Sequence, residues 1–192
     1  MRKKNNLKVI VTLLIVTVLC ICGAIRFFSI NSKYPQNEKV VYKMGDSFVC
    51  QNAKFTITDT YMLKRMDIMN DDDLSEYLEE NSDYLKSEDL NLGLIKIIIS
   101  NTTDDEITVD LTAFHIESGA FSLQFYYPLV MYYNDCGMYI KLSKGEQKTF
   151  IAPVPISSEQ FLNYDSTDIR NRTYYLVSSL YPQKIMSEVK FN

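Results

Sequence analysis

The chain of 192 residues is long enough for one ordinary domain with an appendage, and its hydrophobic content of 46% is sufficient to fill a core. The net charge of −4 is unevenly distributed, because residues 1–26 carry five Lys or Arg and no acidic residue. The rest of the chain carries 15 basic and 24 acidic residues. A surface of this sign repels phosphate backbones, so we expect no nucleic-acid binding.

An uncharged apolar run of 17 residues, 9–25, follows the basic N-terminus. As a helix it would be about 25 Å long, which is close to the thickness of a bilayer's hydrocarbon core. Basic residues before such a run keep the N-terminus in the cytoplasm. We therefore expect a cytoplasmic tail over residues 1–8 and a signal-anchor helix that crosses the cell membrane once over residues 9–28. The remainder would be extracellular.

Two alternatives to a retained anchor stay open. A cleaved signal peptide would need small residues before the cut, and Cys22 to Ala24 match this requirement only in part. Lipidation would need a small residue before the modified cysteine, whereas Leu19 precedes Cys20 and Ile21 precedes Cys22. The length of the run and its flanking charges favour the retained anchor.

Cys50 and Cys136 are the two cysteines of the exported part. An oxidising compartment would allow a disulfide between them, and two free buried thiols are an equal alternative. The Cys and His residues show no spacing typical of a metal site or a redox enzyme. We therefore expect neither a metal nor a cofactor.

The pattern after a polar spacer, residues 29–43, predicts a β domain over residues 44–192. Two alternating runs, 92–101 and 102–111, predict a central β-hairpin, because each presents one β-branched apolar face. The register that superimposes these faces pairs Ile99 with Ile107, Ile97 with Val109, Ile95 with Leu111 and Lys96 with Asp110.

Further alternating runs predict strands over residues 47–50, 54–62, 138–142, 149–156, 173–180 and 185–191. The phase of the alternation shifts at Thr112 and Ala113, which indicates a bulge or corner. Pro153 and Pro155 remove two backbone donors, so residues 149–156 are expected to form an edge strand or the end of one. A single helical turn is expected within residues 157–162.

Residues 67–89 differ from the rest because they hold ten acidic residues and one Lys. We predict an inserted helix over about 72–89 with Asp72 or Asp73 as its N-cap. Its buried face would consist of four residues: Leu74, Tyr77, Leu78 and Leu85. Asp71 to Asp73 lack the spaced oxygens and the Gly of a calcium loop, so a solvated acidic face is expected.

Aromatic residues are concentrated between Phe121 and Tyr139. Core packing and strand surfaces account for most of them. If any surface binds a partner, we expect it to use four tyrosines: Tyr126, Tyr127, Tyr132 and Tyr133. His115, the only histidine, is expected to be exposed on a strand. The sequence shows no nucleophile and base that would make it catalytic.

Three segments resemble a known family: residues 95–111, residues 142–150, and Val154 with Pro155. They are similar to the telokin-like immunoglobulin-fold domains of Gram-positive bacterial surface proteins, over roughly residues 44–191. The resemblance implies an N-terminal tether and no assigned activity, and it carries over no functional residue. The long acidic insertion and the missing lipobox depart from that family.

The expected fold is therefore mainly β, an immunoglobulin-like antiparallel β-sandwich with one inserted acidic helix after a single transmembrane helix. The expected function is an extracytoplasmic module without catalysis, for protein interaction or a structural role at the cell envelope. Another envelope protein would be its partner. The alternative is an accessory or immunity subunit of an envelope transport or secretion complex.

Overall fold

The computed structural model describes residues 2–33, 38–81, 88–161 and 169–191. The chain forms two compact units, Met1–Asn37 and Glu38–Asn192. The first contains the helix α1 (Arg2–Lys33), in which Thr12–Lys33 is long and apolar enough to cross a membrane. The predicted apolar helix is confirmed, although α1 extends five residues beyond the expected end at residue 28.

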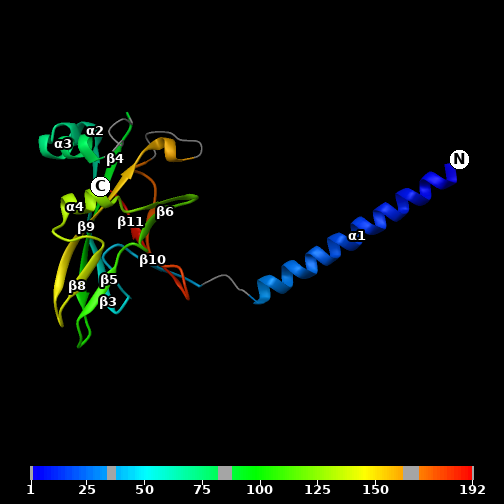
Figure 1. The fold of residues 1–192 in the computed structure, drawn as a ribbon, viewed down its shortest axis with the longest axis horizontal. Helices are drawn as coiled ribbons and strands as arrows, with labels where there is room; N and C mark the ends of the chain where they lie inside the picture. The colour runs from blue at the N-terminus through cyan, green and yellow to red at the C-terminus, as the bar shows by residue number, and fades with distance from the viewer. Residues whose placement is uncertain (1, 34–37, 82–87, 162–168, 192) are drawn as a thin grey trace. The chain divides into compact units, whose positions relative to one another are not determined.

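The second unit consists mainly of strands, and Figure 1 shows the short helices α2 and α3 together at one end of it. One sheet has the order β1-β11-β10-β6-β7, a second has the order β2-β3-β4-β9, and β5 and β8 form a third. The strands are β1 (Lys39–Tyr42), β2 (Ser47–Cys50), β3 (Ala53–Lys64), β4 (Asn91–Asn101), β5 (Ile107–Asp110), β6 (His115–Ser118), β7 (Phe121–Gln124), β8 (Tyr139–Leu142), β9 (Gln147–Ile156), β10 (Tyr174–Ser179) and β11 (Lys184–Val189). The helices are α2 (Arg65–Met69), α3 (Asp72–Asn81), α4 (Tyr127–Tyr133) and the 3-10 turn η2 (Ser158–Gln160).

The three sheets share one apolar core. Ile97 of β4, Ile140 of β8 and Leu176 of β10 all belong to it and are almost completely buried. The mainly β sandwich predicted from the sequence is confirmed, and so are the strands expected at β2, β3, β8, β9, β10 and β11. One pair departs from the antiparallel expectation, because β1 runs parallel to β11. β1 lies within the range that the sequence analysis assigned to the spacer.

The predicted hairpin between residues 92–101 and 102–111 is wrong. β4 lies between β3 and β9, with Ile97 opposite both Ile57 and Phe150. β5 pairs instead with β8, where Val109 lies opposite Ile140. The apolar faces themselves are correct, because both strands bury them in the shared core. Every layer of a sandwich needs an apolar inner face, so two matching faces do not show that their strands are neighbours.

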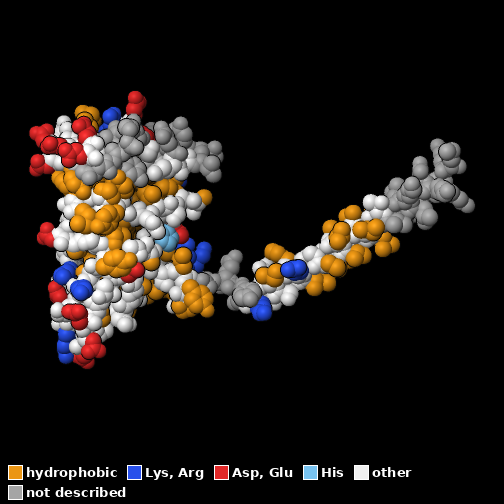
Figure 2. Space-filling view, in the orientation of Figure 1, with side chains coloured by type: hydrophobic (Ala, Val, Ile, Leu, Met, Phe, Trp, Pro, Cys, Tyr) orange, Lys and Arg blue, Asp and Glu red, His pale blue; other side chains and the backbone are white. Residues whose placement is uncertain are grey.

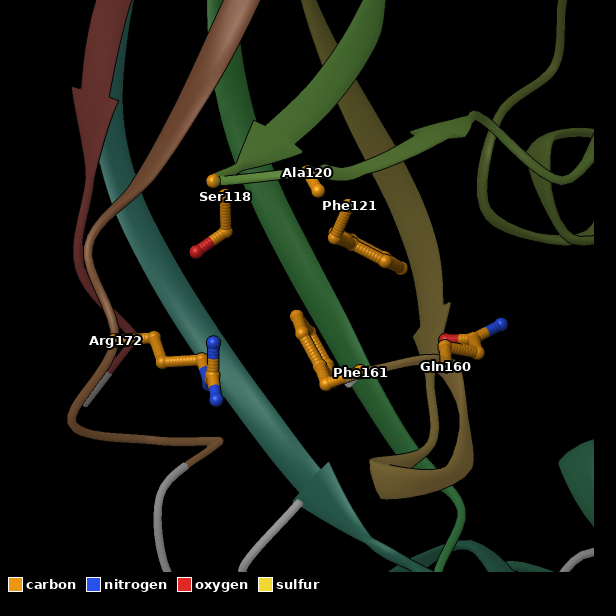
Figure 3. Close-up of a pocket in the computed structure, with 7 residues that line it drawn as sticks. Ser118, Ala120, Phe121, Gln160, Phe161 and Arg172 are labelled. Carbon is orange, nitrogen blue, oxygen red and sulfur yellow. The ribbon is translucent and has the colours of Figure 1, made fainter. Parts of the chain in front are cut away.

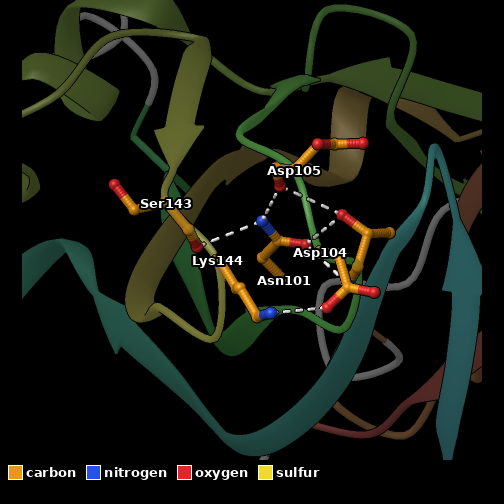
Figure 4. A network of polar contacts seen from close by, with 6 residues as sticks. Asn101, Asp104, Asp105, Ser143 and Lys144 are labelled. Atoms are coloured by element: carbon orange, nitrogen blue, oxygen red, sulfur yellow. Dashed lines mark hydrogen bonds and ion pairs between the residues drawn. The ribbon is translucent and has the colours of Figure 1, made fainter.

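Asn101 explains why the chain leaves β4 without turning back on it (Figure 4). Its side chain is buried, and Nδ2 donates to the carbonyl oxygens of Asp105, Leu142 and Ser143 over 2.7, 3.1 and 3.0 Å. Its Oδ1 accepts from the backbone nitrogen and the hydroxyl of Thr103, both at 2.8 Å. Asn101 therefore joins the β4–β5 loop to the β8–β9 turn, and this holds β5 beside β8.

The acidic insertion forms two helices, α2 and α3, within its described part. Leu74 and Leu78 are buried, as predicted, whereas Leu85 lies outside the described residues. The N-cap of α3 is Asp71, whose Oδ1 accepts from the backbone nitrogen of Leu74 at 3.1 Å. The prediction of Asp72 or Asp73 as the cap is wrong, because the helix begins one residue earlier than the acidic run suggested.

Three further local predictions are confirmed. A turn separates β5 from β6 at Thr112 and Ala113, as the phase shift indicated. β9 is an edge strand of its sheet, as Pro153 and Pro155 predicted. The helical turn expected after it is η2.

Candidate functional site

The helix α4 lies along the free edge of β9. Tyr126 precedes the helix in an extended conformation, and Pro128 occupies its first turn, where a missing backbone donor costs nothing. The backbone nitrogen of Tyr126 donates to the carbonyl oxygen of Pro153 at 3.3 Å. The helix is therefore fastened to the edge strand at its N-terminal end.

Asn134 fastens the other end of α4 to the same strand. Its Nδ2 donates to the carbonyl oxygens of Val130 and Ile151, both at 2.9 Å. Its Oδ1 accepts from the backbone nitrogen of Ile151 at 2.8 Å. One amide side chain thus occupies both backbone groups that Ile151 presents at the open edge, which protects the sheet from adding another strand there.

The four predicted tyrosines, three in α4 and one just before it, differ in burial. Tyr126, Tyr132 and Tyr133 are half-buried against a second apolar cluster, which includes Leu74 and Leu78 of α3. The Tyr132 ring packs against Tyr77 and Tyr133, with centroid distances of 5.0 Å in both cases.

Tyr127 is different because 55% of it is exposed. Its ring and the exposed Met131 both lie beside Gly137, where a side chain would touch them. In Figure 2, acidic side chains gather over α3 and apolar ones over the neighbouring α4. The predicted set therefore divides into one exposed tyrosine and three that contribute to packing.

A groove of about 450 Å³ lies beside α4, between the segment that follows the helix and the first half of β9. We call it the β9 groove, and its lining consists of Tyr133, Asn134, Asp135, Cys136, Gln147, Lys148, Thr149 and Ile151. Burial raises the pKa of Cys136, and nearby Lys148 lowers it by less. Burial likewise raises the pKa of Tyr133. At neutral pH the groove therefore presents an uncharged thiol and an uncharged phenol.

Cys50 and Cys136 are both free thiols in the structure. Cys50 donates to the carbonyl oxygen of Ser178 at 3.5 Å, and burial raises its pKa. Both side chains are partly buried, and the disulfide and the pair of free thiols both stay predictions.

His115 is not exposed as expected, since only 12% of its side chain is accessible. Its Nε2 lies 3.0 Å from Oε1 of Glu117, whose Oε2 accepts from Lys184 at 2.5 Å. Burial raises the pKa of Glu117, but the hydrogen bonds from Lys184 and His115 outweigh it and leave this pKa lowered. Glu117 thus forms an ion pair with Lys184 and a hydrogen bond with His115, and this ion-paired cluster joins β6 to β11. Within the described part of the chain, no three His, Cys, Asp or Glu residues are grouped to hold a metal ion.

A second cavity, of about 210 Å³, opens between the β6–β7 hairpin and η2 (Figure 3). The guanidinium of Arg172 lies over the ring of Phe161, 4.3 Å from its centroid. The hydroxyl of Ser118 donates to the carbonyl oxygen of Thr173 at 3.0 Å. Sequence reasoning missed this cavity, because nothing distinguishes Arg172 from the other basic residues of the chain.

Comparison with protein families decides where the chain belongs. The family described as a domain of unknown function, DUF5028, matches residues 31–185. The chain belongs to the DUF5028 family. The match includes every strand except most of β11, of which it contains only Lys184 and Ile185. Comparison of the sequence with curated proteins gave no significant match.

Solved structures similar to this DUF5028 protein share little sequence with it. A candidate lipoprotein of Bacillus subtilis, ycdA, is 13% identical, with a TM-score of 0.49 over 75% of this chain and 38% of its own. The yjhA protein of Bacillus subtilis is 14% identical, with a TM-score of 0.44 over 79% and 99% of the two chains. An uncharacterized β-sandwich protein of Clostridium difficile is 12% identical, with a TM-score of 0.41 over 81% and 98%. The DUF5028 chain spans well under half of the first of these proteins.

Proposed function

We propose that this DUF5028 protein is a non-catalytic binding module, held at the outer face of the cell membrane by α1. One observation carries the proposal. A short segment, residues 34–37, connects an apolar helix of membrane length to a β-sandwich. Basic residues precede the helix, which favours a cytoplasmic N-terminus and an extracellular domain. The resemblance to telokin-like immunoglobulin-fold domains of Gram-positive bacteria supports the same assignment.

The partner we propose is another envelope protein, and the surface around α4 is the proposed place of contact. Tyr127 and Met131 offer an exposed apolar face, and the neighbouring β9 groove offers polar groups beside it. Aromatic side chains next to hydrogen-bonding groups are typical of protein interfaces. The neutral thiol of Cys136 and the ion-paired state of Glu117 both favour binding over catalysis.

Site-specific photo-crosslinking in the native membrane tests this surface. A photoreactive residue in place of Tyr127 should capture a partner protein. The same residue in place of Tyr61, which is 47% exposed on β3, serves as the control. We expect a crosslinked species that is several-fold stronger at position 127. Equal capture at both positions, or none at position 127, would contradict the proposed contact surface.

A pair of alanine variants separates binding from packing at the same surface. With the photoreactive residue placed instead at Met131, which is 45% exposed, Tyr127→Ala should weaken capture of the partner. It should change the free energy of unfolding by less than about 0.5 kcal/mol, because the ring is exposed. Tyr132→Ala should lower stability measurably, because its ring packs between Tyr77 and Tyr133. Urea unfolding of both variants provides the measurement, and a larger stability loss for Tyr127→Ala would count against the assignment.

A further inference from the structure

The turn between β10 and β11 carries two adjacent apolar side chains in solvent. Tyr181 is 80% exposed and Leu180 is 55% exposed. Among the described large hydrophobic residues of the domain, Tyr181 has the highest exposed fraction. Tight turns usually present Gly, Asn, Asp or Ser to water, so this pair is an unusual choice for a turn. We call Leu180 and Tyr181 the apolar tip.

The apolar tip is held beside the first residue of the domain, Glu38. The backbone nitrogen of Lys184 donates to the carbonyl oxygen of Glu38 at 2.8 Å. Nε2 of Gln183 donates to a carboxylate oxygen of Glu38, also at 2.8 Å. Figure 1 shows the β10–β11 turn next to the start of β1, and Figure 2 shows apolar side chains at this corner. The tip is thus anchored where the chain enters the sandwich.

The covalent chain limits how far this corner can be from the end of α1. The helix ends at Lys33, and five residue steps lead from there to Glu38. Five residues span at most about 18 Å when fully extended. The headgroup region of one leaflet is roughly 5–8 Å thick. So short a segment limits Glu38 to within about 18 Å of the end of α1, which allows the apolar tip to reach the headgroups.

We propose that Leu180 and Tyr181 insert into the headgroup region of the bilayer that α1 crosses. This inference rests on the proposed function, since it requires α1 to be a membrane anchor. Tyrosine is enriched at membrane interfaces because its ring is apolar and its hydroxyl stays hydrated.

The charges around the apolar tip are mixed, since the Glu38 carboxylate accepts a hydrogen bond from Gln183 and two lysines lie close by. Lys39 is exposed at the same corner, and a long basic side chain can reach the headgroups from there. Lys184 is held by Glu117 and lies just behind the tip. Two apolar residues bind a membrane weakly alone, but a tethered pair has a high effective concentration at the surface. The tip would thereby fix which side of the sandwich faces the lipid and which side remains open to partners.

The absence of tryptophan from the sequence allows a direct test with the full chain. Tyr181→Trp places a single fluorescent reporter at the tip, and Tyr127→Trp places a matched reporter on exposed α4. Both variants are reconstituted in phosphatidylcholine vesicles that contain lipids brominated near the top of the acyl chains. We expect blue-shifted emission and several-fold stronger quenching for Tyr181→Trp. Adding Leu180→Asp to that variant should reduce the quenching.

Flotation of the same vesicles separates the two ways in which the proposal can fail. If the full chain floats with the vesicles and both reporters are quenched equally, the insertion of the tip is contradicted and the membrane anchor stands. If the chain does not float, the anchor and the insertion are both contradicted. Flotation together with selective quenching at position 181 supports both.

Discussion

Single polar side chains hold the loops of this sandwich in place, and Asn101 is the clearest example. It makes five side-chain hydrogen bonds from a buried position.

We expect Asn101→Ala to lower the free energy of unfolding by about 2–4 kcal/mol, because buried carbonyl groups lose their donor. Asn101→Asp should cost a similar amount, since a carboxylate keeps the size but cannot donate. Urea unfolding measures both, with exposed Asn70→Ala as a control that should change stability by less than about 0.5 kcal/mol. An equal effect of all three variants would refute this role.

Glu117 gives the domain a predictable response to acid. Its pKa is lowered in the folded state, so its ionised form stabilises the fold at pH values above the ordinary value of 4.5. This contribution is lost as the pH falls through the lowered pKa. Glu117→Gln should therefore destabilise the domain at neutral pH by on the order of 1 kcal/mol, and the difference from the native chain should shrink below pH 4.

Unfolding free energies measured across this pH range test the prediction for Glu117. Glu188→Gln is the control, because the Lys190 side chain beside Glu188 is 64% exposed and the pair contributes little. A difference between Glu117→Gln and the native chain that stays constant down to low pH would exclude the ion-paired cluster as its origin.

At the scale of elements, the contact between α4 and β9 closes an edge that would otherwise be open. Asn134→Ala should expose both backbone groups of Ile151 and loosen the C-terminal end of α4. We expect a loss of about 1–3 kcal/mol in stability together with a greater tendency to self-associate, because unpaired strand edges add further strands. Light scattering at rising protein concentration provides the measurement, and the exposed Asn70→Ala variant should remain monodisperse. Unchanged association would show that α4 does not protect the edge.

The same element shows where sequence reasoning reaches its limit. The faces that strands bury could be predicted, because alternation at Ile95, Ile97 and Ile99 depends only on local residues. The pairing of the strands could not be predicted, because the partners of β4 and β5 are distant in the sequence. Residues 127–133 have the composition of a strand, and they form a helix because of Pro128 and the packing against β9. β1 was missed because four residues show little pattern, and its parallel partner lies at the other end of the chain.

The candidate site likewise depends partly on local sequence and partly on contacts between segments that are distant in the chain. The concentration of aromatic residues indicated the region around α4, and within it burial separates Tyr127 from Tyr126, Tyr132 and Tyr133. That separation depends on α3, which packs against α4 from a distant part of the sequence. The β9 groove likewise combines residues 133–136 with residues 147–151, and no single segment indicates it.

For the molecule as a whole, the proposed function requires that the N-terminal helix holds the β-sandwich outside the cell. Protease added to intact cells that carry the full chain, tagged at its N-terminus, tests this most directly. We expect the domain to be digested while the tag stays protected with α1 in the membrane. A domain that resists the protease on intact cells, and is digested only after the membrane is opened, would contradict it.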